Sequence, residues 1–226
     1  MSSFSIYRNC VIRDNLIGGA LLLGTGHNML SCRFSGNRRV QVEIGHGATA
    51  NLDNCLIIGN AAGNAEQPPA DGVYMEYGRL DHCTIVNSKI GLSVGIGASV
   101  KNSVIQTCSQ PIVVASKAVE TLVLDHTILG PGNSIIGDQK VSQDNWADVA
   151  WQLKLSATTT IDTLALEAPL YRLNRNAPAE SEPAPGANLE LSQGYTPLVD
   201  DTARPRMNQP PGVTYRCGLD QPWRAD

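Results

Sequence analysis

A short phrase centred on a small residue recurs along the chain between Met1 and Gly130, usually preceded by asparagine or histidine and followed by apolar residues. The small residues are Cys10, Cys32, Cys55, Cys83, Ser103 and Thr127. Their successive positions differ by 22, 23, 28, 20 and 24. A period of this length is typical of a solenoid, in which each repeat packs on its neighbours and buries a continuous core.

The segments between the phrases indicate strands rather than helices. Short apolar or alternating runs occur at 10–12, 20–23, 40–44 and 73–77, and Gly, Asn or Asp interrupts them. None is long enough for the periodicity of a helical repeat, which needs about 10–12 residues, and the leucine spacing of leucine-rich repeats is absent. The sequence therefore predicts an all-β chain that forms a parallel β-helix of about six coils.

Stacked coils place equivalent residues above one another about 4.8 Å apart. We expect the four repeated cysteines to form an apolar column inside the solenoid, continued by Ser103 and Thr127. Asparagine recurs five positions after the cysteine, at Asn15, Asn37 and Asn60. These side chains are expected to form an amide ladder at a turn, where asparagine also tolerates a positive φ.

Composition divides the chain near residue 130. Residues 1–130 contain three prolines and balanced charges, nine basic and nine acidic, whereas residues 131–226 contain ten prolines, eight basic and twelve acidic residues. We expect a β-helix over 1–130 and a mostly irregular, Pro-rich capping tail over 131–226. Within the tail, 144–151 is expected to form a short helix, and the part from Pro169 to wrap back over the solenoid with Tyr171, Tyr195 and Trp223 as anchors.

Charge and hydropathy exclude some classes of protein. The net charge of −4 lacks the basic excess that a general nucleic-acid binder needs, so no nucleic-acid partner is expected. The chain has no apolar stretch of the length that a membrane-spanning helix requires, which excludes such a helix. The start of the chain, from Met1 to Arg8, lacks the pattern of a secretory signal.

The Asn-Cys-x-Ile phrases at 9–12 and 54–57 resemble the right-handed parallel β-helix repeat proteins of the pectin-lyase-like superfamily. Residues 170–179, 200–206 and 213–220 resemble the tail that closes many bacterial and viral β-helices, with Ala177 where that tail has serine and Ala203 where it has glycine. The resemblance implies a right-handed solenoid and favours an extracellular or virion protein. It implies an architecture and no particular reaction.

Polysaccharide lyases with this fold use a basic side chain and carboxylates on one strand face. The longest repeat, with an insertion over 63–71, offers the best such group. Strand alternation is expected to place Tyr74 and Glu76 on one side and Val73, Met75 and Tyr77 on the other, with Glu43 stacked beside Glu76 from the preceding coil. The candidate catalytic residues are Glu43, Glu76 and Arg79, and the candidate substrate-binding residues are Arg38, Arg39, Tyr74 and Asp81. The alternative is a solvated strand face.

Cysteines and histidines do not predict a cofactor. The repeated cysteines are expected to be reduced core residues, and no Cys-x-x-Cys motif is present. Cys108 and Cys217 lie outside the repeat position and are either buried or free. His82 and His126 occupy the position that asparagine takes in other repeats, which favours a turn or surface role over metal binding.

Three functions remain open. The chain is a structural or glycan-binding β-helix module, a polysaccharide lyase or glycosidase, or a fragment of a longer β-helix protein whose activity lies elsewhere. Strand character begins near Phe4 without an obvious preceding cap, so a partner subunit or further segment over the first coil is expected, and a homo-oligomer is possible. A polysaccharide is the expected ligand in the first two cases.

Overall fold

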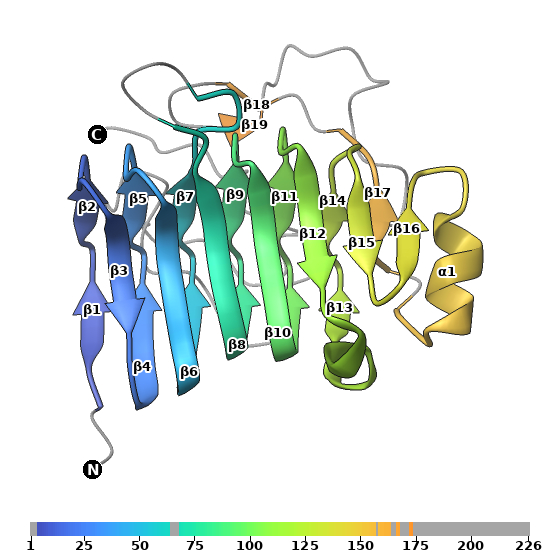
Figure 1. Ribbon diagram of the computed structural model, residues 1–226, viewed down its shortest axis with the longest axis horizontal. Helices are drawn as coiled ribbons and strands as arrows, with labels where there is room; N and C mark the ends of the chain where they lie inside the picture. Colours follow the sequence, from blue (N-terminus) through green and yellow to red (C-terminus); the bar gives the residue numbers. More distant parts are fainter. Residues whose placement is uncertain (1–3, 64–67, 157, 164–165, 168–171, 174–226) are drawn as a thin grey trace, which may run out of the picture.

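The structure is a computed structural model, and it describes residues 4–63, 68–156, 158–163, 166–167 and 172–173. It is an all-β solenoid of about six coils, as the repeats predict (Figure 1). Every coil contributes to two sheets, whose strands pair in parallel from coil to coil.

The first sheet contains the long strands and the second contains one short strand from each coil. The strands of the first sheet are β1 (Ile6–Arg8), β3 (Gly18–Leu22), β4 (Thr25–Leu30), β6 (Val40–Asp53), β8 (Asp71–Asp81), β10 (Ile90–Lys101), β12 (Gln110–Val114), β13 (Val123–Asp125), β15 (Ser134–Ile136) and β16 (Gln139–Val141). Those of the second are β2 (Val11–Arg13), β5 (Arg33–Ser35), β7 (Leu56–Ile58), β9 (Thr84–Val86), β11 (Val104–Gln106), β14 (Ile128–Leu129) and β17 (Thr160–Ile161). A 3-10 helix, η1 (Ser116–Thr121), joins β12 to β13, and β18 (Leu166–Glu167) pairs antiparallel with β19 (Arg172–Leu173).

The register of the second sheet confirms the repeat spacing. The residues that follow the repeated small residue pair across the sheet in the order Val11, Arg33, Leu56, Thr84, Val104 and Ile128. The residue before it has a positive φ, between 45° and 55°, in all six coils, and includes His82 and His126 as well as three asparagines and Ser31. The expectation that these histidines replace asparagine at a turn is therefore confirmed.

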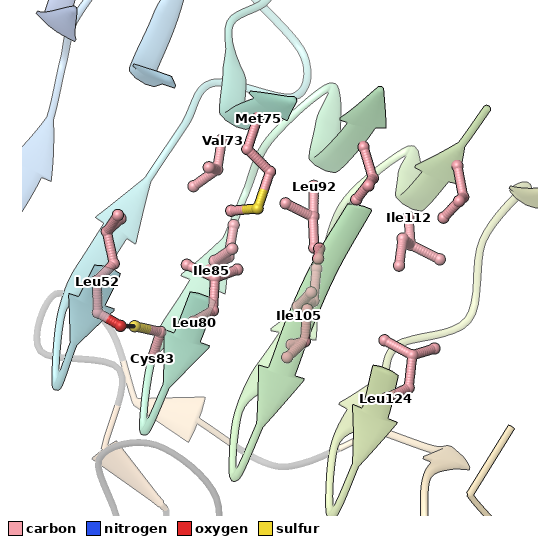
Figure 2. Close-up of a cluster of buried hydrophobic side chains, with 14 of the residues drawn as sticks. Leu52, Val73, Met75, Leu80, Cys83, Ile85, Leu92, Ile105, Ile112 and Leu124 are labelled. Carbon is pink, nitrogen blue, oxygen red and sulfur yellow. Dashed lines mark hydrogen bonds between the residues drawn. The ribbon is translucent and has the colours of Figure 1, made fainter. Parts of the chain in front are cut away.

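The core lies between the two sheets as columns of small and branched side chains (Figure 2). Val73 and Leu92 of the first sheet face Ile85 and Ile105 of the second. Cys32, Cys55 and Cys83 are buried free thiols in one column, and Cys10 at its end is partly exposed. Each thiol donates to the carbonyl two residues earlier, and the thiols of Cys55 and Cys83 also reach a carbonyl of an earlier coil, as Cys83 reaches Leu52 at 3.4 Å. Backbone carbonyls therefore accept hydrogen bonds from the weak thiol donors of the cysteine column.

The predicted amide ladder is present in part: it joins Asn15 to Asn37 at the turn after the second sheet and continues to Gln41 instead of Asn60. The side-chain amide of Asn15 donates to Oδ1 of Asn37 at 2.8 Å, and Asn37 donates to Oε1 of Gln41 at 2.7 Å. Asn37 and Gln41 are fully buried, so this hydrogen bonding offsets the cost of removing two amides from water. Asn60 lies at the inserted loop, where its Oδ1 accepts a hydrogen bond from the backbone of Gly63 at 3.0 Å.

The pairing of the long strands β6, β8 and β10 shifts register near their middle, and this irregularity, which we call the bend, divides the first sheet into two outer surfaces. Face 1 consists of the segments before the bend, and face 2 of the segments after it. The segments of face 1 are 18–22, 40–44, 71–75, 90–94 and 110–114, and those of face 2 are 25–30, 49–53, 77–81, 97–101 and 123–125. Between β6 and β8, the register shifts from the pair Ile44–Met75 to the pair Thr49–Tyr77.

The C-terminal end of the solenoid is covered. The coil continues past residue 130, because β15 pairs in parallel with β12 and β17 with β14. The antiparallel strand β16 then closes the first sheet, and the predicted helix follows as α1 (Trp146–Gln152), at the end of the stack in Figure 1. The buried indole of Trp146 donates to the carbonyl of Thr159 at 2.7 Å, which ties α1 to the last coil. Tyr171, Tyr195 and Trp223 lie outside the described residues.

At the opposite end, no further strand of the described residues pairs with β1, β2 or β3 on the side away from the stack. Eight large apolar side chains are exposed within residues 4–23: Phe4, Ile6, Tyr7, Val11, Leu16, Ile17, Leu21 and Leu23. They lie on or beside β1, β2 and β3, the first strands of the stack (Figure 1). We call this surface the N-terminal edge.

Candidate functional site

The two carboxylates expected to form a pair are not stacked. Glu43 pairs in register with Tyr74, and Leu21 precedes it in the same column of face 1. The expectation that Glu43 stacks beside Glu76 is wrong, because the bend of β6 holds four residues between Ile44 and Thr49 where β8 holds one residue, Glu76. Unequal bends of this kind cannot be read from strand alternation alone.

Glu76 lies at the bend itself and is only 9% exposed. Its Oε2 accepts a hydrogen bond from the backbone of Gly47 at 3.3 Å. Tyr74, on face 1, comes close to the same bend. Its hydroxyl and the Glu76 side chain both lie beside Gly95 of β10, within 3.6 Å of the position that a Cβ on this glycine would occupy. The Glu76 side chain therefore forms a hydrogen bond between neighbouring coils, and Tyr74 lies beside it.

Tyr77 and Arg79 point outward on face 2. Tyr77 is 41% exposed, whereas strict alternation predicts that it shares the inner side with Val73 and Met75. That prediction is wrong for Tyr77 because the bend at Glu76 reverses the alternation. Arg79 lies in a column of outward residues with Asn51 on one side and Ser99 on the other. We call Asn28, Asn51, Arg79 and Ser99 the Arg79 column.

Asp81 fixes the orientation of Arg79. The guanidinium of Arg79 pairs with Oδ2 of Asp81, and Asn102 donates to Oδ1 at 2.9 Å. Nδ1 of the buried His82 lies 2.9 Å from the same Oδ1. Burial by itself raises the pKa of Asp81, but His82, Arg79 and Asn102 outweigh it and lower that pKa to about 2. Asp81 is therefore ionised at neutral pH and holds a half-exposed arginine in place.

Arg38 and Arg39 lie away from face 2, at the turn that leads into β6. Both side chains are exposed, and their backbone amides donate to the carbonyls of Asn15 and Ile17. Of the predicted residues, the structure thus brings together Arg79 and Asp81, and separately Tyr74 with its register partner Glu43 and with Glu76. It does not unite all seven in one site.

Sequence reasoning missed one regular feature of face 2. A charged residue stands two positions before the repeated small residue in four successive coils, at Asp53, Asp81, Lys101 and Asp125. These residues pair in register, so they form one column beside the Arg79 column. We call it the charged column. The fixed offset from Cys55, Cys83, Ser103 and Thr127 is the signal that would have found it.

The thiols of Cys32 and Cys108 are buried and held in their protonated form. Burial raises the pKa of Cys108 to about 11, and hydrogen bonding within the column together with burial raises the pKa of Cys32 further. Protonated, buried thiols are poor nucleophiles and poor metal ligands. No group of three or more His, Cys, Asp or Glu side chains within the described residues is arranged to hold a metal ion. Cys217 lies outside those residues.

The fold and the surface define a parallel β-solenoid whose face 2 carries an ordered arginine and an exposed tyrosine. Comparison of the chain with protein-family models, with curated proteins and with solved structures finds no match. Among the described residues, no helix has the length and apolar character needed to cross a membrane.

Proposed function

We propose that the chain is a β-helix module that binds a polysaccharide along face 2. The observation that carries the proposal is the exposed Tyr77 next to the Arg79 column. A tyrosine ring packs against the apolar side of a sugar ring, while amide and guanidinium groups pair with its hydroxyls. Since Asp81 already orients Arg79, little side-chain entropy is lost when a glycan binds.

The columns of face 2 suit an extended polymer. Asn28, Asn51, Arg79 and Ser99 repeat at the coil spacing of about 4.8 Å, so they offer a polar contact at every step across the strands. A binding module of this kind agrees with the resemblance of the chain to the pectin-lyase-like β-helix proteins. The same resemblance supports a place in an extracellular or virion assembly.

A panel of acidic and neutral polysaccharides, immobilised and titrated with the purified chain, tests the proposal. Tyr77→Ala and Arg79→Ala should each weaken binding about tenfold or more, whereas Arg13→Ala, an exposed arginine on β2, should not. Equal binding by all four proteins would refute a role for face 2.

The same incubations test the enzymatic alternative. Assays for unsaturated product and reducing ends are run with the native chain and with Glu76→Gln. Turnover that Glu76→Gln abolishes, without loss of the fold, would replace binding by a lyase or glycosidase as the function.

We also propose that a second copy of the chain covers the N-terminal edge. The eight exposed apolar side chains of that edge gather between Phe4 and Leu23, whereas α1 and β16 cover the opposite end of the stack. Head-to-tail stacking therefore lacks a second open edge, which favours a two-fold contact between two N-terminal edges.

Light scattering after size-exclusion chromatography tests this contact. The native chain should be a dimer, and the double variant Leu16→Ser/Ile17→Ser should be a monomer. A monomeric native chain would refute this contact.

A further inference from the structure

An open, solvent-facing cavity lies at the far end of face 2, where the segment after α1 passes beside β13. Residues 122–125 and 154–156 line it, and its volume is about 360 Å³. Its walls combine the exposed Val123 and the backbone of the buried Leu122 and Leu124 with Asp125, Lys154 and Ser156. Mixed walls and this volume fit a ligand of small-molecule size.

Asp125 is held rigidly at the wall of this cavity. Oδ1 of Asp125 accepts hydrogen bonds from the hydroxyl of Thr158 at 2.8 Å and that of Ser156 at 3.4 Å, and Nδ1 of His126 lies 2.8 Å away. None of these contacts uses Oδ2. Although burial by itself raises the pKa of Asp125, these partners and Lys101 lower it overall. The site thus contains an oriented, ionised carboxylate.

Lys154 stands in a backbone conformation that disfavours lysine. Its φ is 55°, and it follows α1 at a position where the amide of Leu155 donates to the carbonyl of Ala150 at 2.8 Å. Glycine is the usual residue in such a helix-ending turn, and a residue with a Cβ is strained there. A cation near a helix C-terminus is favourable at any position of the last turn, so the helix alone does not explain a lysine with a positive φ.

We propose that this cavity, the Asp125–Lys154 pocket, binds one neutral sugar residue through adjacent hydroxyl groups. Asp125 accepts from the hydroxyls, Lys154 donates to them, and the exposed Val123 contacts the ring. One carboxylate and one ammonium group balance each other, which favours a neutral ligand over an acidic one. The inference rests on the proposed function in one respect: the residue bound is the end of the glycan that lies along face 2.

The position of the pocket supports that last step. Asp125 is the final member of the charged column, one coil beyond Lys101 and two beyond Asp81. Val123 continues the Arg79 column into the same wall after Ser99. A chain that follows these columns from Arg79 therefore reaches the pocket after two coils.

The experiment uses the full chain and small probes. Amide chemical shifts are followed by NMR during titration with methyl glycosides of glucose, galactose and mannose, with galacturonate and with cyclohexanol. At least one neutral glycoside should shift the amides of residues 122–125 and 154–156 with a millimolar dissociation constant, the range expected for a ligand of roughly a dozen heavy atoms.

Lys154→Gly is the decisive variant because it removes the ammonium group and relieves the backbone. It should weaken glycoside binding about tenfold while the melting temperature stays equal or rises. Lys140→Ala, an exposed lysine on β16, is the matched control and should change neither quantity.

Each other outcome overturns the inference. No shift at these amides with any sugar, unchanged affinity in Lys154→Gly, or stronger binding of galacturonate or cyclohexanol than of every neutral glycoside would each do so. The proposed function is tested separately. It fails if Tyr77→Ala binds polysaccharide as tightly as the native chain does, and glycoside shifts at the pocket do not depend on Tyr77.

Discussion

The two ends of the solenoid differ in how their terminal strands are covered. At the C-terminal end, β16 turns antiparallel and α1 buries Trp146, Val149 and Ala150 against the last coil. At the N-terminal edge, β1 is exposed along its whole length and β2 along most of it. A stack of parallel coils needs a cap wherever its backbone groups would otherwise meet water without partners, because an open strand edge pairs readily with other chains. The comparison shows that described residues cap one end, whereas the other end exposes apolar side chains, on which we propose that a second copy packs.

The largest expected difference between the ends is in the free energy of unfolding lost when one aromatic side chain is removed from each end. Trp146→Ala removes a 9% exposed indole and its hydrogen bond to Thr159, so it should lower the free energy of unfolding by about 3–5 kcal/mol. In the dissociated chain, Phe4→Ala at the N-terminal edge removes a 67% exposed ring and should change it by less than about 0.5 kcal/mol. Urea denaturation followed by circular dichroism measures both. Equal losses would show that the N-terminal edge is packed in solution.

The next prediction compares the pH dependence of stability contributed by the middle of the solenoid with that contributed by its capped end. The Asp81–His82 pair is buried at the fourth coil, whereas the Asp125–His126 pair near the capped end is one-third exposed. The pKa of Asp81 is lowered to about 2, against about 3.9 in an unfolded chain. The lowered pKa stabilises the fold above about pH 4, and this contribution of about 2 kcal/mol disappears as the pH falls toward 2.

Denaturation as a function of pH tests this contribution. Asp81→Asn should be less stable than the native chain at neutral pH, and the difference should shrink below about pH 4. Asp125→Asn is the comparison, and its pH dependence should be weaker because solvent screens the exposed pair. A difference for Asp81→Asn that is constant with pH would mean that the carboxylate is not the stabilising group.

The sequence contains enough information for the coils but not for the bends. The cysteine phrases fix the register of the second sheet because each coil places one small residue in the same turn, and the pairs Val11–Arg33 and Leu56–Thr84 follow directly. The bend between faces 1 and 2 has no such marker. It holds four residues in β6 and one in β8, which moves Glu43 away from Glu76 and turns Tyr77 outward. Register within a coil depends on how side chains fill that bend, and spacing does not encode it.

A third prediction concerns the buried hydrogen bonds of the second coil, beneath the N-terminal edge. Asn37, in the second coil, is 2% exposed and joins Asn15 to Gln41. Asn37→Ala leaves Gln41 buried with fewer partners and should cost about 1–3 kcal/mol. Hydrogen exchange should then accelerate in β3 and β5 and remain unchanged in β14. Exchange that accelerates equally in β14 would show that the two ends unfold as one unit.

The smallest effect is expected for Leu21, an exposed leucine of the N-terminal edge. Leu21 and Leu22 are neighbours on β3, yet Leu21 is 59% exposed and Leu22 is 4% exposed. In the dissociated chain, Leu21→Ala should change the free energy of unfolding by less than about 0.5 kcal/mol, whereas Leu22→Ala should cost about 2–5 kcal/mol. If dimerisation buries Leu21, the Leu21→Ala loss should instead grow with protein concentration, because association stabilises only the folded state. Denaturation at several concentrations therefore distinguishes an edge that only faces water from one that binds a second copy, and a concentration-independent loss for Leu21→Ala would exclude Leu21 from the contact.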